Sequence, residues 1–395
     1  MNCSICIRAV TIKALTKLAL VALLAPGWDQ IVAAATVTRG PYLQMGTPTS
    51  VAVRWRTDSA TDSRVRFGPA PGSLISFAND PTLTTEHEVA VSGLSPDTQY
   101  FYSVGTSTTT LAGGDVTYFW VTFPPTGVPA PTRVWVLGDS GTANANAMAV
   151  RDAYVNATGT RHTDLWLMLG DNAYNSGLDS EYQTAVFDIY PTMLRKSVLF
   201  PALGNHDTAQ GTQFVDTYPY FSIFTLPRNG ECGGLASGTE HYYAVDFGNL
   251  HFICLDSMTA DRSPGGPMAV WVQNDLATTS QDWVVAFWHH PPYSKGSHNS
   301  DTEIELIQMR QTFLPILEAG GVDLVLAGHS HSYERSFLID GHYGDSTTFS
   351  SDNVLDGGSG RDPSPYRKAP GRPMHDGAVY TVAGSSGQIS GGTLD

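Results

Sequence analysis

The sequence predicts two folded regions in series, an all-β sandwich followed by an α/β domain. Between residues 36 and 123, short segments alternate apolar and polar residues, which is the period of half-buried strands. After residue 132 the apolar residues come in continuous runs separated by helical stretches, as expected for a sheet covered on both faces. A stiff, Pro-rich linker at 124–132 joins the two regions.

Composition limits the class of protein further. The 395 residues are 42% hydrophobic and 15% charged, which is typical of a globular chain and excludes a disordered one. Lys and Arg total 22 against 37 Asp and Glu, giving a net charge of -15. Such a surface repels nucleic acid and anionic lipid, so we expect neither as a partner. The sequence does not specify the oligomeric state.

Residues 1–35 have the pattern of an export signal. Basic residues stand at Arg8, Lys13 and Lys17. They precede an apolar run at 18–25, and the small residues 33–35 follow as a cleavage site. The run is too short to span a bilayer, so we expect no stable membrane span and a protein that is secreted or periplasmic. An amphipathic surface helix or an uncleaved anchor is the alternative.

Two cysteines remain after residue 35, and the sequence leaves their state open. In an oxidising compartment Cys232 and Cys254 form a disulfide if their geometry permits. Cys254 stands in the strand-like run 251–255, which equally favours two buried, reduced side chains.

The region 36–123 reads as a β-sandwich module. Strands are predicted at 51–56, 64–67, 88–91, 99–104 and 117–123. Tyr100 enters one of them shortly after Pro96, which resembles the tyrosine corner of fibronectin type III domains. The region holds no cluster of carboxylates or histidines, so we expect a spacer or a wall for its neighbour.

The region 133–395 reads as alternating strands and helices. Apolar runs predict strands at 134–137, 165–169, 198–200, 252–255, 284–287 and 322–326. Helices are predicted at 144–155, 181–195, 269–276 and 303–317.

Five of the apolar runs are followed by short polar segments. These are Asp139-Ser-Gly141, Gly170-Asp-Asn-Ala-Tyr174, Gly204-Asn-His-Asp207, His289-His-Pro-Pro292 and Gly328-His-Ser-His331. Each alone has a plain structural interpretation as a turn, a helix start or a buried histidine. The carboxyl ends of strands in an open α/β sheet converge on one edge, so the five together predict one site. Their oxygen and nitrogen donors, without thiolate, suit Fe, Mn or Zn better than Mg or Ca.

This motif series resembles that of the binuclear metallophosphoesterases, and specifically of the purple acid phosphatases. The distinctive element is Tyr174, three residues beyond Asp171, because purple acid phosphatases use this tyrosine as a phenolate ligand to ferric iron. The preceding β module and the run 328–335 strengthen the likeness. The resemblance implies that residues 133–395 form a calcineurin-like metallophosphoesterase catalytic domain with two mixed sheets flanked by helices.

The resemblance also implies a ligand for each position of a two-metal centre. The ferric site would take Asp139, Tyr174 and His331. The divalent site, holding Zn, Mn or Fe, would take Asn205, His289 and His329, with Asp171 bridging both ions. His289 is preferred to His290 because the family's ligand stands two residues before the proline at Pro291.

Two histidines are candidates for contact with substrate. His206, beside the ligand Asn205, is the first candidate for general acid or phosphate donor. His298 resembles in position the family's substrate-side histidines, with a solvated loop histidine as the alternative. Asn205, His206 and His298 are therefore the expected substrate-binding residues.

The function implied by the resemblance is that of an exported acid phosphatase. It would hydrolyse small phosphate monoesters by attack of a metal-bound hydroxide, because three anionic ligands leave the metal pair with a net charge of about +2. A phosphodiesterase or nucleotidase of the same fold is the alternative. A non-catalytic adhesion or binding protein with a structural metal is a third reading.

Two segments near the end of the sequence have no assigned role. Four basic residues fall within 357–373 and predict either a lid that gathers anionic substrate or a solvated loop. After the strand predicted at 378–382 the chain ends where relatives add further strands, so a C-terminal truncation is left open.

Overall fold

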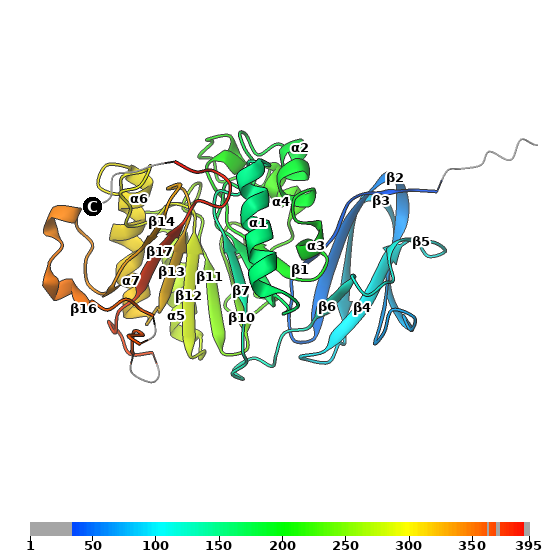
Figure 1. Cartoon of the computed structure of the whole chain (residues 1–395), viewed down its shortest axis with the longest axis horizontal. Coiled ribbons are helices and arrows are strands. Elements are labelled where there is room, and N and C mark those ends of the chain that lie inside the picture. The colour runs from blue at the N-terminus through cyan, green and yellow to red at the C-terminus, as the bar shows by residue number, and fades with distance from the viewer. Residues whose placement is uncertain (1–33, 362, 369–371, 391–395) are drawn as a thin grey trace, which may run out of the picture. The chain divides into compact units, whose positions relative to one another are not determined.

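The computed structural model describes residues 34–361, 363–368 and 372–390 (Figure 1). Residues from Ala35 onward belong to one compact unit. The export signal predicted at 1–35 falls almost entirely outside the described residues. Within the described ranges, no helix has both the length and the apolar character needed to cross a bilayer.

Six strands form the N-terminal β region. They are β1 (Val37–Gln44), β2 (Ser50–Gly68), β3 (Ser76–Ser92), β4 (Gln99–Gly105), β5 (Thr110–Gly113) and β6 (Phe119–Val121). β2 is one long strand where the sequence predicted two, because its first half pairs with β1, its second half with β4, and β3 pairs with both halves. Tyr100 Oη accepts the backbone N–H of Ser95 at 3.0 Å, as the tyrosine-corner pattern predicts.

The first sheet of the α/β region continues from this β region. β7 (Val134–Leu137), β8 (Leu165–Met168) and β9 (Val198–Pro201) are parallel neighbours. β1 joins β9 through the parallel pair Leu43 and Val198, so a single nine-stranded sheet includes the order β5-β4-β2-β1-β9-β8-β7. The sequence did not predict this continuity, because pairing between distant segments leaves no local pattern.

The second sheet has six strands. In spatial order they are β10 (Tyr243–Phe247), β11 (Leu250–Cys254), β12 (Trp283–Trp288), β13 (Leu324–Ala327), β17 (Val379–Ala383) and β14 (Tyr333–Arg335). The inner pairs are parallel and the two outer pairs antiparallel, which confirms the predicted mixed sheets. β15 (Leu338–Ile339) and β16 (Val354–Asp356) form a small separate pair.

Helices cover the outer faces of the two sheets (Figure 1). They are α1 (Ala145–Thr158), α2 (Asp179–Tyr182), α3 (Pro191–Leu194), α4 (Pro219–Ile223), α5 (Pro267–Thr278), α6 (Ile304–Gln308) and α7 (Leu314–Ala319). π-helical turns occur at η1 (Gln183–Phe187) and η3 (Met309–Phe313), and 3-10 turns at η2 (His206–Thr208), η4 (Ser346–Thr348) and η5 (Ser351–Asn353). The helix predicted at 181–195 is divided because Pro191 begins a new helix.

The alternation of side chains along β12 shows how the layers pack. Val285 and Phe287 join the core shared with the first sheet, whereas Val284, Ala286 and Trp288 join a second core under α5 and α7. Successive strand residues point to opposite faces, so β12 is buried on both. The two sheets therefore pack face to face with helices outside, and their strand ends lie at a common edge.

The structure bears on two questions that the sequence left open. Cys232 and Cys254 are both free and buried, so they form no disulfide with each other. In the basic segment, Lys368 Nζ donates to Asp323 Oδ1 at 2.6 Å, next to the amino end of β13. The site residues follow the carboxyl end of that strand, so this contact of Lys368 lies at the other end of β13 from them.

Candidate metal centre

The predicted ligands all lie just beyond the carboxyl ends of parallel strands of the two sheets. Asp139 follows β7, Asp171 and Tyr174 follow β8, Asn205 follows β9, His289 follows β12, and His329 and His331 follow β13. Parallel strands bring these segments to one edge, which is the physical basis on which the sequence predicted a shared site. The structure brings together the whole predicted set, including His206 and His298.

Three side chains meet at one point of this edge. Asn205 Oδ1 lies 2.8 Å from His289 Nε2 and 3.1 Å from His329 Nδ1. The two imidazole nitrogens are themselves 3.2 Å apart. Ligands bound at roughly 2.1 Å to one ion stand about 3 Å from each other, so this spacing fits a shared cation.

A second group gathers around Asp139. Tyr174 Oη lies 3.1 Å from Asp139 Oδ1, and His331 Nε2 lies 3.6 Å from the same oxygen. The donors are a carboxylate, a phenol and an imidazole, a set that suits a harder and more highly charged ion than the first group.

Asp171 lies between the two groups. Its Oδ1 is 3.4 Å from His289 Nε2, and donor atoms of Asp139, Asp171 and His289 all fall within 4.8 Å of one another. Asp171 Oδ1 accepts the backbone N–H of His206 at 2.8 Å, but Oδ2 is buried without any hydrogen-bond partner. A buried carboxylate oxygen without a donor is unfavourable, and a cation satisfies it. The residues present therefore fit a metal pair.

Burial keeps the imidazoles of the site neutral. It lowers the pKa of His289 and brings the pKa values of His329 and His331 down to about 4. Neutral imidazoles offer the lone pair that a metal ion binds.

Burial and neighbouring charges shift the pKa values of the acidic candidate ligands. Burial and the neighbouring Asp171 raise the pKa of Asp139. Burial also raises the pKa of Asp171, but His289, His206 and hydrogen bonds outweigh it and lower the value. Burial and the two carboxylates raise the pKa of the Tyr174 phenol far above its usual range. Ionisation of Tyr174 at neutral pH therefore needs a cation beside its oxygen.

The backbone explains why glycine precedes several ligands. Asp139, Asp171 and His329 have φ values of 55°, 53° and 66°, in the left-handed region that is uncommon outside glycine. A Cβ on Gly204 would stand 2.4 Å from Asp171 Oδ1, and one on Gly328 would stand 2.6 Å from Asp139 Oδ2. The tight loops place ligands close together, and only glycine leaves room beside them.

Two supporting carboxylates were missed by the sequence analysis. Asp207 accepts the backbone N–H of Asn172 at 3.0 Å and that of Gly204 at 2.9 Å, which ties the loops after β8 and β9 together. Glu303 Oε2 lies 3.4 Å from His329 Nε2, on the side of the ring that faces away from Asn205. Asp207 stood within a polar segment that could have indicated its role, whereas no sequence signal marked Glu303.

His290 makes different hydrogen bonds from its neighbour His289. Its Nδ1 lies 2.9 Å from Ser257 Oγ, and the same hydroxyl accepts its backbone N–H at 3.0 Å. His289 Nε2 is the atom that lies 2.8 Å from Asn205 Oδ1, whereas a nitrogen of His290 falls within 4.8 Å of donor nitrogens of His289 and His329.

The two candidate substrate histidines line a cavity of about 440 Å³ beside the ligands. His206 Nδ1 lies 2.8 Å from the carbonyl oxygen of Asn175, so Nδ1 carries the proton that this carbonyl accepts. His298 Nδ1 lies 2.8 Å from Glu303 Oε2, and its ring centroid is 3.7 Å from that of His329. Other lining residues include Gln210, Thr212, Met258 and Glu305.

Comparison with known protein families agrees with this geometry. The model of the calcineurin-like phosphoesterase family matches residues 132–333, a range that contains the whole candidate ligand set. The chain belongs to this family. The model of the purple acid phosphatase N-terminal domain matches residues 39–124, which places the chain among the purple acid phosphatases.

Relatives of this calcineurin-like phosphoesterase include proteins named purple acid phosphatase and one named phosphoenolpyruvate phosphatase. It is 28% identical over 279 residues to purple acid phosphatase 15 of Arabidopsis thaliana, covering 63% of this chain and 49% of the relative. It is 25% identical to a phosphoenolpyruvate phosphatase of Allium cepa, covering 90% of this chain and 69% of the relative. The chain thus spans about half of the first of these relatives.

Among solved structures, the purple acid phosphatase PPD1 of yellow lupin seeds has the same fold. The match has a TM-score of 0.66 at 17% identity and covers 90% of this chain and 67% of the lupin chain. The structure of PhoD matches with a TM-score of 0.53 at 13% identity, covering 78% of this chain and 73% of that one. These likenesses establish the fold.

Proposed function

We propose that this purple acid phosphatase hydrolyses small phosphate monoesters at a two-metal centre. The observation that carries the proposal is the position of Asp171, between one donor group around Asp139 and another around Asn205. A buried carboxylate with a free oxygen at the meeting point of two donor groups is what a bridging ligand requires.

The proposed ligands follow the two donor groups. Asp139, Tyr174 and His331 would hold Fe(III); Asn205, His289 and His329 would hold Zn, Mn or Fe; and Asp171 would be shared. When bound, such an ion pair neutralises the charge of a phosphate group and lowers the pKa of a water molecule that supplies the nucleophile.

His206 is the proposed proton donor to the leaving oxygen. Its Nδ1 proton is held by the carbonyl of Asn175, so a proton on Nε2 is the one available to substrate in the cavity. His298 is proposed to hold the phosphate group, because Glu303 fixes its Nδ1 and leaves the rest of the ring at the cavity wall. Asn205 is proposed to contact substrate beside the metal.

We also propose the boundaries of the domains and the export of the protein from the cell. Residues 36–123 would form the β domain, 124–132 the linker and 133–395 the catalytic domain, supported by the family matches at 39–124 and 132–333. Residues 1–35 would direct export to the periplasm or the medium. Amino-terminal sequencing of protein recovered outside the cell tests export: a mature chain beginning near residue 36 supports it, and a chain retained inside with residue 1 intact contradicts it.

Metal analysis with a visible spectrum tests the centre itself. Protein loaded with Fe(III) and Zn should hold two metal ions per chain and absorb visible light by tyrosinate-to-iron charge transfer. Tyr174→Phe should remove the absorption. Tyr333→Phe is the matched control, because this side chain is 62% exposed on β14. Colour that survives in Tyr174→Phe overturns the assignment of Tyr174.

Turnover of p-nitrophenyl phosphate against bis(p-nitrophenyl) phosphate, at equal metal loading, tests the substrate class. Faster hydrolysis of the monoester supports the proposal. Preference for the diester would assign a phosphodiesterase or nucleotidase instead. A protein that holds both metals and hydrolyses neither ester would be a non-catalytic binding protein.

A further inference from the structure

One short helix connects the N-terminal β region to the metal-binding loops. α2 is a single turn, and three of its side chains are anchored to different parts of the protein. Asp179 binds arginines of β1 and β2, Glu181 binds the backbone after Tyr174, and Tyr182 binds Asp207. Contacts made by one rigid turn move together, so the three attachments are mechanically linked.

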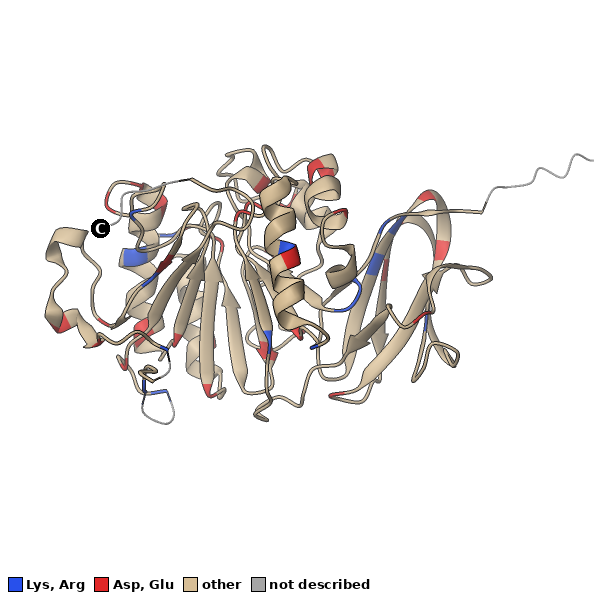
Figure 2. Cartoon of the chain, viewed as in Figure 1, with Lys and Arg blue, Asp and Glu red and all other residues tan. Residues whose placement is uncertain are grey.

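The attachment to the β region is a double arginine clamp. Arg39 donates to Asp179 Oδ1 at 2.9 Å and Oδ2 at 3.1 Å, and Arg56 donates to Oδ2 at 2.7 Å and Oδ1 at 2.8 Å. Both forks are bidentate, the geometry that makes an arginine–carboxylate pair strong and directional. Figure 2 shows the basic residues of the β region and the acidic residues of α2 in contrasting colours.

Arg39 is held so that it cannot easily leave this position. Its side chain is only 1% exposed, compared with 43% for Asp179. Arg39 Nε also donates to Gln183 Oε1 at 2.8 Å, and its guanidinium lies 4.6 Å from the ring centroid of Phe187. A buried guanidinium needs its partners, because removal of one leaves an uncompensated charge.

Glu181 links α2 to the loop that follows Tyr174 and contacts His206. Its carboxylate accepts the backbone N–H groups of Asn175 at 2.7 Å, Ser176 at 3.0 Å and Leu178 at 2.9 Å. Asn175 follows Tyr174 directly, and its carbonyl oxygen holds His206 Nδ1 at 2.8 Å. The loop that aims both aromatic rings at the site therefore depends on where α2 lies.

Tyr182 carries the connection to the loop that bears Asn205. Its hydroxyl donates to Asp207 Oδ1 at 2.6 Å. Asp207 is the carboxylate that joins the backbone of Asn172 to that of Gly204. α2 thus reaches a loop from each of the two donor groups.

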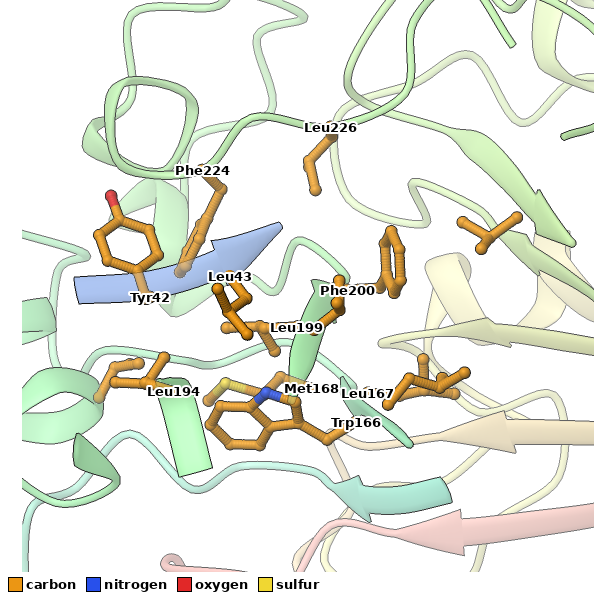
Figure 3. Close-up of a cluster of buried hydrophobic side chains, with 14 of the residues drawn as sticks. Tyr42, Leu43, Trp166, Leu167, Met168, Leu194, Leu199, Phe200, Phe224 and Leu226 are labelled. Atoms are coloured by element: carbon orange, nitrogen blue, oxygen red, sulfur yellow. The ribbon is translucent and has the colours of Figure 1, made fainter. Parts of the chain in front are cut away.

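Apolar packing holds the β region in a fixed position relative to α2. Figure 3 shows Tyr42 and Leu43 of β1 packed among Leu194, Leu199 and Phe224 of the α/β region. Tyr42 Oη also donates to the carbonyl of Ile223 at 2.6 Å. β1 is therefore a rigid base for the clamp.

We propose that the β region takes part in building the metal centre, with Arg39, Arg56 and Asp179 as positioning residues for Tyr174, His206 and Asn205. From its sequence, this region was expected to be only a spacer or a wall for its neighbour. The inference rests on the ligand set proposed above, because it concerns where those ligands are held.

Asp179→Asn and Arg39→Gln test the proposal, with Arg54→Gln as a matched control. Arg54 also crosses from β2 to the α/β region, donating to the carbonyl of Ser222 at 2.7 Å and to Thr225 Oγ1 at 3.1 Å, and neither of these hydrogen bonds is to α2. Metal retention is measured by titration of the loaded protein with a chelator, together with the visible spectrum and the separate values of kcat and KM.

The clamp variants should release metal at about tenfold lower chelator concentration than the wild type, as when other outer contacts of metal ligands are lost. Arg54→Gln should match the wild type in metal retention even if its melting temperature falls. Asp179→Glu, which keeps the charge, should recover part of the loss. If the other variants do not fold, Arg56→Gln is tested in their place. It removes only one of the two arginine–carboxylate pairs, and its side chain is partly exposed.

The outcomes separate this inference from the proposed function. Equal metal retention in wild type, Asp179→Asn and Arg39→Gln overturns the inference and leaves the two-metal centre intact. An equal loss in Arg54→Gln also overturns it, since general loosening then accounts for the effect. A wild-type protein that binds no metal overturns the proposed function itself.

Discussion

Oε2 of Glu303 lies 2.8 Å from Nδ1 of His298. The same oxygen is 3.4 Å from Nε2 of His329, so one carboxylate contacts a candidate substrate histidine and a candidate metal ligand. Burial raises the pKa of Glu303, but hydrogen bonds from His329 and the backbone outweigh it and lower the value to about 2. Glu303 is thus a charged orienting group for two rings.

Glu303→Gln should weaken metal binding by about tenfold, because an outer carboxylate that orients a ligand imidazole typically contributes that much or more. The midpoint of a chelator titration measures the change. Glu305→Gln is the control, since Glu305 lines the same cavity but its ion-pair partner is Arg262 at 3.7 Å. Equal effects of the two substitutions would mean that loss of negative charge, rather than orientation, is responsible.

His206→Asn should lower kcat by roughly a hundredfold while both metals stay bound, because a general acid contributes to the chemical step. Metal content by elemental analysis and kcat on p-nitrophenyl phosphate are measured on the same sample. Esters with better leaving groups need less proton donation, so their rates should fall less. A uniform loss across leaving groups would contradict the proton-donor role.

Loss of the proton from His251 at alkaline pH should lower the stability of the folded protein. Its ring nitrogens lie 2.7 Å from Asp246 Oδ1 and 2.7 Å from Asp275 Oδ2. Burial lowers the pKa of His251, but hydrogen bonds to both carboxylates outweigh it and raise the value to about 9. Because the unfolded pKa is about 6.5, the stabilisation is complete below that pH and is lost as pH rises through about 9.

Urea unfolding at pH 6 and pH 10 measures this effect. The free energy of unfolding of the wild type should fall on the order of 3 kcal/mol further than that of His251→Gln over this range. His375→Gln, at a side chain that is 45% exposed, is the control and should keep the wild-type dependence. Parallel pH profiles for wild type and His251→Gln would refute the prediction.

Leu199→Ala should destabilise the protein by about 2–5 kcal/mol, because it opens a cavity where β1 packs against β9. Leu199 is 0% exposed in the cluster of Figure 3. Chemical denaturation measures the change, and Leu355→Ala, at a side chain that is 50% exposed, is the control. A loss below about 1 kcal/mol at Leu199 would mean that the junction is loosely packed.

Local sequence determined the chemistry of the site. Each candidate ligand follows one of five strands by a few residues, and a buried run followed by Gly-Asp or Gly-His is visible without any long-range information. Parallel strand ends must meet at an edge, so a single shared site followed from the order of the motifs, whereas the resemblance to the purple acid phosphatases implied which side chains would be its ligands. The mixed α/β fold followed from the same runs.

The tertiary structure decided which groups support those ligands. Arg39 and Asp179 are 140 positions apart, and Glu303 stands far from the motif of His329 that it contacts. The same holds for the pairing of β1 with β9 and for the state of the two cysteines, which are buried free thiols. Such contacts are chosen by the packing of whole layers, and packing depends on residues from every part of the chain. A single sequence therefore shows which side chains can bind a metal, and the folded chain shows what holds them in place.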